Sequence, residues 1–184
     1  MLFGKLIAAC AAAFLFLAAP ALAQTSDPEN TLLIQLKDGT VTIQLRPDLA
    51  PNHVKRLKEL ARKGFYDGVV FHRVIEGFMA QTGDPTGTGT GGSDLPDLKA
   101  EFTNTHFGRG VVGMARSRDP DSANSQFFIM YGDADLLDGG YTVFGEVVSG
   151  MEFVDNIKKG DSANNGLVDG PDKIVSMKVA ADAQ

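Results

Sequence analysis

The chain of 184 residues contains no tryptophan, one cysteine and only three histidines. Cys10 lies in an apolar N-terminal segment, so the rest of the chain forms no disulfide and offers no thiol nucleophile. The histidines, His53, His72 and His106, lack the spacing of a metal site, and no further cysteine is present to complete one. These absences exclude a disulfide framework and thiol catalysis, and we expect neither a metal nor a cofactor.

A strongly basic stretch is also missing, and the formal net charge is −6 at pH 7. The densest group of basic residues, between positions 55 and 63, has the spacing of a solvated helix face. Nucleic-acid binding depends on clustered lysine and arginine that neutralise phosphates, so we expect no nucleic-acid partner. The acidic surplus requires no role beyond solubility.

One long apolar run is present near the N-terminus, from Leu6 to Ala19. It follows a single charge, Lys5, and precedes Ala21-Leu22-Ala23, which supplies small residues where signal peptidase cleaves. The run is shorter than the ~20 residues of a membrane-spanning helix. We therefore expect residues 1–23 to be a signal peptide cleaved before Gln24. The mature protein would then lie in the periplasm without membrane attachment.

Cys10 leaves a second possibility open for this segment. Ile7-Ala8-Ala9-Cys10 resembles a lipoprotein processing box, which would make the protein a lipoprotein anchored at Cys10. Most of the apolar run lies after Cys10, however, and the stretch before it is shorter than the ~7–15 residues of a signal core. Cleavage before Gln24 is favoured.

The remaining chain is predicted to be one domain, because no repeat or linker divides it. We expect a flexible tail at residues 24–30, a domain at 31–181 and a short tail at 182–184. Asp38-Gly39 between two β-rich runs indicates a hairpin. Pro51 can begin a helix, which Gly64 would end. Strands are expected at 31–36, 40–45, 69–75, 78–82, 111–115, 126–130, 142–147 and 173–179, and a second helix at 150–159. This pattern is typical of a mainly β, closed antiparallel barrel.

A glycine-rich stretch, Gly87 to Gly92, matches the pattern G-x-G-x-x-G. A dinucleotide site would need a helix beginning at the last glycine, and Ser93-Asp94-Leu95-Pro96 is a poor helix start. The stretch also lacks the lysine of a phosphate-binding loop. We interpret it as part of a long loop, residues 85–96, beside a peptide groove.

The most informative stretch runs from Phe71-His72-Arg73-Val74-Ile75 into Gly77-Phe78-Met79-Ala80-Gln81. It places one arginine among aromatic residues, a methionine and a glutamine, without a cysteine or serine nucleophile beside it. Such a site suits a reaction that makes and breaks no covalent bond, and rotation about an X–Pro peptide bond is such a reaction.

The same stretch resembles the signature of the cyclophilin family of peptidyl-prolyl cis-trans isomerases. Ser125-Gln126-Phe127-Phe128-Ile129 and the blocks Leu137-Asp138-Gly139 and Val143-Phe144-Gly145 resemble that family in the same order. The resemblance covers Thr31 to about Ala181. It implies an eight-stranded closed antiparallel barrel capped by two α-helices, and a monomer that binds proline-containing peptides and unfolded proteins.

The resemblance also implies the role of each site residue. Arg73 would be the catalytic donor to the proline nitrogen, Gln81 would orient it, and Phe78 would complete the catalytic group. The implied substrate-binding residues are Met79, Gly89, Ala115, Arg116, Gln126, Phe128, Leu136, Leu137 and Tyr141. Among these, the backbone of Arg116 would hold the carbonyl that precedes proline.

Strand alternation separates the residues of 126–130 into two faces. If Phe127 and Ile129 fill the barrel, Gln126 and Phe128 lie on its outer wall, where an apolar groove would take the proline ring. By the same alternation His72 faces away from Arg73, and we expect it to be buried and structural.

Three positions depart from the pattern of many eukaryotic members. Leu136 replaces a tryptophan and Tyr141 a histidine, as in the bacterial branch, so we expect weak binding of cyclosporin. Arg116 replaces an asparagine, and its charge would favour acidic substrates. The expected function is prolyl isomerisation in exported or unfolded polypeptides, which assists folding. The alternative is a catalytically weak peptide-binding chaperone or scaffold of the same fold, and the presence of both Arg73 and Gln81 favours the enzyme.

Overall fold

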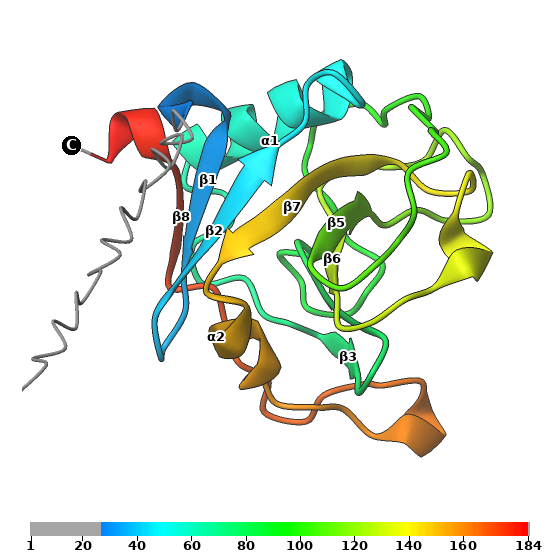
Figure 1. Cartoon of the computed structure of the whole chain (residues 1–184). Helices are drawn as coiled ribbons and strands as arrows, with labels where there is room; N and C mark the ends of the chain where they lie inside the picture. The colour runs from blue at the N-terminus through cyan, green and yellow to red at the C-terminus, as the bar shows by residue number, and fades with distance from the viewer. Residues whose placement is uncertain (1–26, 184) are drawn as a thin grey trace, which may run out of the picture.

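The computed structural model describes residues 27–183, and Figure 1 shows their arrangement. The predicted signal peptide, its cleavage before Gln24 and the alternative of lipidation at Cys10 lie outside the described residues. Among the helices that are described, none has the length and apolar character needed to cross a membrane. The part of the expected tail that is described ends in a 3-10 turn, η1 (Pro28–Asn30), whose Glu29 pairs with Arg62 and Lys58.

The described chain folds into eight strands and two α-helices, in the order that the sequence predicts. The strands are β1 (Thr31–Gln35), β2 (Thr40–Leu45), β3 (Arg73–Ile75), β4 (Met79–Thr82), β5 (Val111–Met114), β6 (Phe127–Met130), β7 (Val143–Ser149) and β8 (Ser176–Val179). The helices are α1 (Pro51–Arg62) and α2 (Met151–Asp155), and the further 3-10 turns are η2 (Asp135–Leu137), η3 (Ser162–Asn164) and η4 (Ala180–Asp182). The second helix is shorter than predicted.

All eight strands belong to one antiparallel sheet with the order β3-β4-β6-β5-β7-β2-β1-β8. The segments that lead into the two end strands meet at a single bridge, Val70 to Lys173, flanked by a hydrogen bond from the Phe71 N–H to the Asp172 carbonyl at 2.9 Å. The fold is therefore mainly β, with a curled sheet. Complete closure of the barrel by a regular ladder is not confirmed.

Local sequence accounts for the first hairpin and for α1. Gln35 pairs with Thr40 across the Asp38-Gly39 turn, as predicted. Pro51 occupies the first turn of α1, and the helix buries Val54, Leu57, Leu60 and Ala61 on one side. The first N–H groups of a helix have no partner within it. Here the Glu101 carboxylate, from a distant loop, accepts hydrogen bonds from the Asn52 and His53 N–H groups at 3.2 and 3.1 Å. Figure 1 shows α1 above the curled sheet and α2 below it.

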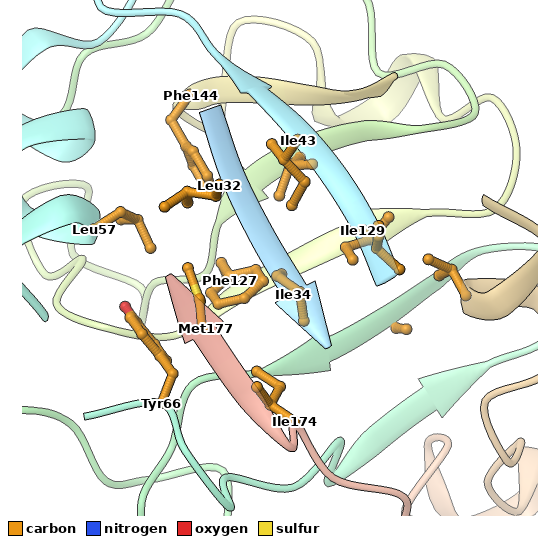
Figure 2. Close-up of a cluster of buried hydrophobic side chains, with 14 of the residues drawn as sticks. Leu32, Ile34, Ile43, Leu57, Tyr66, Phe127, Ile129, Phe144, Ile174 and Met177 are labelled. Atoms are coloured by element: carbon orange, nitrogen blue, oxygen red, sulfur yellow. The ribbon is translucent and has the colours of Figure 1, made fainter. Parts of the chain in front are cut away.

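The alternation predicted for residues 126–130 is confirmed. Phe127 and Ile129 lie in the main core, which Figure 2 shows with Leu32 and Ile34 around them. Phe127 packs edge-on against Tyr66 and Phe144, with ring centroids 5.6 and 6.0 Å away. Phe128 and Met130 instead join a second cluster on the outer face of the sheet, with Met79, Phe107, Ala134, Leu137 and Val143.

Candidate active site

Strand register places the central site residues in one row. Arg73 on β3 pairs with Gln81 on β4, and Gln81 pairs with Phe128 on β6. Side chains at paired positions lie on the same face of a sheet, about 5 Å apart. The three side chains therefore share the outer face that carries the second cluster.

A cavity of about 240 Å³ opens on this face. Its lining consists of predicted site residues: Arg73, Phe78, Met79, Gln81, Ala115, Arg116, Phe128, Leu136, Leu137 and Tyr141. A second cavity of about 510 Å³, lined mainly by residues with polar side chains and by glycines, shares Gln81, Ala115 and Arg116 with the first and contains the remaining two predicted residues, Gly89 and Gln126. The shared lining makes the two cavities one groove, with an apolar end and a polar end.

The apolar end has a floor of buried side chains. Met79, Phe128 and Leu137 are buried, and the Phe128 ring meets the Tyr141 ring edge-on at a centroid distance of 5.9 Å. Gly113 on β5 provides the space for this floor, because a Cβ there would lie 2.7 Å from the Phe128 ring. Leu136 stands at the rim with 81% of its surface exposed. The result is a small hydrophobic pocket that stays open to solvent.

Arg73 lies at the edge of this pocket with neutral groups around it. Its Nη1 donates to Gln81 Oε1 at 3.1 Å, its Nε to the Asn165 carbonyl at 3.0 Å, and its Nη2 to Asn165 Oδ1 at 3.0 Å. Burial lowers the pKa of Arg73 from its usual value, but a guanidinium remains charged in proteins. Among the described residues no carboxylate pairs with this guanidinium, so its positive charge is held in place without being neutralised.

Gln81 continues a chain of hydrogen bonds away from Arg73. Its Nε2 donates to Gln126 Oε1 at 2.9 Å, and Gln126 Nε2 donates to the carbonyls of Gly89 and Gly91 at 3.1 and 2.8 Å. In each amide the oxygen accepts a hydrogen bond from the side of Arg73, and the nitrogen donates in the direction of the glycine loop. These bonds fix the orientation of both side chains. The loop therefore supports the geometry of Arg73 through two glutamines.

The glycine-rich loop is organised around Asp84, which is buried. The carboxylate accepts hydrogen bonds from the N–H groups of Gly89, Gly91 and Thr86 at 2.6, 3.0 and 2.8 Å. Burial alone would raise the pKa of Asp84, but the hydrogen bonds, that from Gly91 foremost, outweigh it and hold the pKa at about 2. The N–H groups that a phosphate loop would offer to a ligand are turned onto an internal carboxylate, which argues against nucleotide binding.

Comparison with known proteins identifies the family. Residues 31–179 match the family model described as cyclophilin type peptidyl-prolyl cis-trans isomerase. The chain belongs to the cyclophilin family.

Similar proteins of known sequence or structure support membership of this family. The chain is 55% identical over 190 residues to a probable peptidyl-prolyl cis-trans isomerase of Brucella suis, with 96% of this chain and 97% of the relative covered. It is 43% identical to peptidyl-prolyl cis-trans isomerase B of Bacillus subtilis, over 73% of this chain and 95% of the relative. A Hirschia baltica cyclophilin structure superposes with a TM-score of 0.74 at 29% identity, over 85% of this chain and 76% of that one.

A further solved relative is relevant to ligand binding. The Cryptosporidium parvum cyclophilin, crystallised in the presence of the dipeptide Ala-Pro, superposes with a TM-score of 0.73 at 30% identity. The match covers 81% of this chain and 98% of that one. The chain is therefore a peptidyl-prolyl cis-trans isomerase of the cyclophilin type.

Arg116, which departs from the pattern of many eukaryotic members, has its side chain tied into the wall of the groove. Its Nε and Nη2 donate to the Gly140 carbonyl at 3.1 and 2.8 Å, and its Nη1 donates to the Ser117 carbonyl at 2.9 Å. The guanidinium also lies over the Tyr141 ring, 4.4 Å from the centroid. Three of the five N–H groups of Arg116 are thus engaged in the wall of the groove, and the expected preference for acidic substrates stays a prediction.

Two residues of this cyclophilin's site were not predicted from the sequence. Asn165 contacts Arg73 twice, and the only local sign of its conformation is the Asn-Gly pair at 165–166, which favours a turn with positive φ. Asp84 lies three residues after Gln81 and was given no role. Its burial behind a glycine loop could not be deduced from a pattern that also suits phosphate binding.

The histidines stand outside the groove. His72 is buried, as expected, and the described residues offer neither of its ring nitrogens a hydrogen-bond partner. Burial lowers the pKa of His72 and so favours the neutral form of its ring. His106 is exposed, and its hydrogen bond to Asp138 raises its pKa. The structure brings His106, Asp135 and Asp138 within 4.8 Å of one another, a grouping that sequence spacing did not reveal.

The isomerase activity of this cyclophilin should be nearly independent of pH from about pH 6 to 9. Arg73 stays charged and Gln81 does not titrate. Burial lowers the pKa of His72 from its usual value, and its ring lines neither cavity of the groove, so its titration should not affect turnover. Measurement of kcat/KM against pH tests this expectation. An inflection near pH 6.5 that disappears in His72→Gln, but persists in His106→Asn, would show that His72 takes part in catalysis.

Proposed function

We propose that this cyclophilin isomerises X–Pro bonds in exported and unfolded polypeptides through electrostatic stabilisation by Arg73. The observation that carries the proposal is the position of an arginine with neutral neighbours at the edge of an apolar pocket. The barrier to rotation is about 18–20 kcal/mol because rotation breaks amide resonance. The twisted state has a localised lone pair on the proline nitrogen, to which Arg73 would donate.

This arrangement favours the transition state over either planar isomer. A planar amide delocalises the nitrogen lone pair, so the guanidinium gains little from it before rotation begins. An interaction that strengthens only in the transition state raises kcat. The donor needs no reorganisation, because Gln81 and Asn165 already hold it in place.

Substrate binding would divide between the two ends of the groove. The proline ring would occupy the apolar pocket of Phe78, Met79, Phe128 and Leu137, which fixes one side of the rotating bond. The residues before proline would follow the polar end past Ala115, Gln126 and Gly89. The Arg116 N–H, for which the described residues supply no acceptor, would bind the carbonyl that precedes proline.

We also propose that the protein works in the periplasm as a monomer. The support for export is the apolar segment followed by Ala21-Leu22-Ala23. Mass spectrometry of the protein from a periplasmic extract should give a mature N-terminus at Gln24. A mature chain beginning with a lipidated Cys10 would favour the alternative.

A prolyl isomerisation assay on a short Xaa-Pro peptide tests the function directly. The wild type should accelerate cis–trans exchange at substoichiometric concentration. Aggregation of an unfolded client protein is measured in parallel, with and without this protein. The two measurements separate the enzyme from a peptide-binding chaperone. Wild-type protein that prevents aggregation but leaves peptide exchange at the uncatalysed rate would establish the chaperone instead.

Cyclosporin should inhibit this protein weakly. Leu136 stands exposed at the rim of the pocket where many eukaryotic members have a tryptophan, and leucine offers neither an N–H donor nor a flat aromatic surface. Leu136→Trp should therefore strengthen inhibition while leaving peptide turnover within about twofold. Val148→Trp, another exposed position outside both cavities, serves as the control. Strong inhibition of the wild type would contradict the expectation.

A further inference from the structure

We propose that Asn165 is a positioning residue for isomerisation, which holds the Arg73 guanidinium in its productive orientation without neutralising it. The proposal rests on the catalytic role of Arg73 proposed above. Asn165 lies in the loop after η3 and is separated from Arg73 by 92 positions in the sequence.

The contacts of Asn165 leave a defined part of the guanidinium free. Its carbonyl accepts from Nε and its Oδ1 from Nη2, both at 3.0 Å, so one residue binds an entire edge of the planar group. Gln81 takes one N–H of Nη1 at 3.1 Å. A guanidinium has five N–H groups, so one on Nη1 and one on Nη2 remain. Within residues 27–183, the Nη1 group has only the Met79 sulfur at 3.9 Å as a further acceptor, and thioether sulfur is a weak one. These two donors are the ones available to substrate.

The backbone of Asn165 is held in the conformation that this contact needs. Its φ of 52° makes it the one non-glycine residue with positive φ in the described part of the chain. Asparagine tolerates this region better than most residues with a side chain. The loop is fixed to the strand of Arg73, because the Val74 N–H donates to the Gly166 carbonyl at 2.8 Å and the Gly160 N–H to the Val74 carbonyl at 2.9 Å. The strand of Arg73 and the loop that carries its acceptor are thus joined by backbone hydrogen bonds on both sides of Val74.

The chemical nature of the side chain is as important as its position. Glycine would suit the same φ but lacks the side-chain oxygen. Aspartate would suit both the φ and the hydrogen bond, but its carboxylate would form an ion pair with Arg73 and weaken the field at the proline nitrogen. A neutral amide orients the cation and leaves its charge available. Gln81, the other side chain that binds the guanidinium through oxygen, is also a neutral amide.

Asn165→Gly is the direct test, because it keeps the positive φ and the carbonyl contact to Nε and removes only Oδ1. We expect kcat to fall about tenfold, as for the loss of one hydrogen bond to a charged group, with KM within about twofold and the melting temperature unchanged. Asn165→Asp should also lower kcat although it keeps the hydrogen bond. Asn164→Gly, at the exposed neighbouring position, is the matched control and should retain wild-type kcat.

A double-mutant cycle separates positioning from a purely structural role. Lysine cannot use both acceptors of Asn165, so Asn165→Gly should have little further effect on kcat in an Arg73→Lys background. An additive loss in that background would overturn the proposal, as would wild-type kcat in both Asn165 variants. If Arg73→Ala itself retains activity, the proposed mechanism fails. If Arg73→Ala is inactive and the Asn165 variants match the wild type, only the role of Asn165 fails.

Discussion

Replacement of Arg73 by alanine should lower kcat/KM by about 10²–10³-fold, the loss typical of removing one preorganised donor from an active site. The acceptors that Arg73 uses, Gln81 and Asn165, lie at the groove and can bind water once the side chain is gone. The fold should therefore persist, with an unchanged circular dichroism spectrum. Peptide isomerisation assays on the purified variant measure the effect.

Arg109→Ala provides a matched control for this variant. Arg109 is a surface arginine that pairs with Asp155 at 2.7 Å and lines neither cavity of the groove. Its removal also deletes one positive charge, but kcat/KM should stay within about twofold of the wild type, since surface ion pairs contribute little. If Arg73→Ala retains more than about a third of the wild-type kcat/KM, the proposed role of Arg73 is wrong.

Phe127→Ala should destabilise the protein by about 3–5 kcal/mol, the usual cost of removing a fully buried phenylalanine. Phe127 has no exposed surface and packs between Tyr66 and Phe144 in the main core. Its removal leaves a closed cavity that these rings cannot fill. Chemical denaturation gives the free energy of unfolding, and we expect the folded fraction of the variant to keep an intact groove.

Phe128→Ala is the matched comparison, one residue further along β6. Phe128 forms the floor of the pocket, so its removal should weaken binding of the proline ring and lower kcat/KM more than Phe127→Ala does. The loss of stability should be smaller, because the new space joins an existing cavity open to water. The reverse pattern, with activity lost in Phe127→Ala and stability lost in Phe128→Ala, would contradict the assignment of faces.

The elements that local physics determines could be predicted from the sequence. The period of two on β6 separates Phe127 from Phe128 because neighbouring side chains on a strand point to opposite faces. Helix α1 has both a proline at its start and a glycine with a φ of 67° after its end. These signals are local, and the structure agrees with them.

Elements shaped by distant partners were predicted less well. The helix expected at 150–159 ends at Asp155, and the next residues bind across the fold: the Lys158 N–H donates to Asp172 and the Gly160 N–H to the Val74 carbonyl. The strand expected from residue 69 is regular only from Arg73, because Val69 and Phe71 bond to the segment before β8. Tertiary pairing overrides local preference in both places.

The site residues that belong to a family motif could be predicted from the sequence. Those that loops bring to the site from outside the motif could not. The motif gave Arg73, Gln81 and the pocket, which the structure brings together in one groove. Asn165 and Asp84 carry no motif of their own. The role of Asp84 depends on the direction in which the glycine-rich loop turns its N–H groups, which a glycine-rich pattern leaves open. The role of Asn165 depends on the direction in which its own loop turns its carbonyl and side chain toward Arg73.

Exchange NMR on an Ala-Pro peptide, with and without the protein, tests the role of Arg73 most directly because it measures binding and turnover separately. The wild type should accelerate cis–trans exchange of the bound peptide far above the uncatalysed rate, which is one event in tens to hundreds of seconds. Arg73→Ala should bind the peptide within about threefold of the wild-type affinity but exchange it about 100-fold more slowly. An Arg73→Ala variant that binds weakly yet exchanges bound peptide at the wild-type rate would show that Arg73 serves binding alone, and electrostatic catalysis by this residue would be disproved.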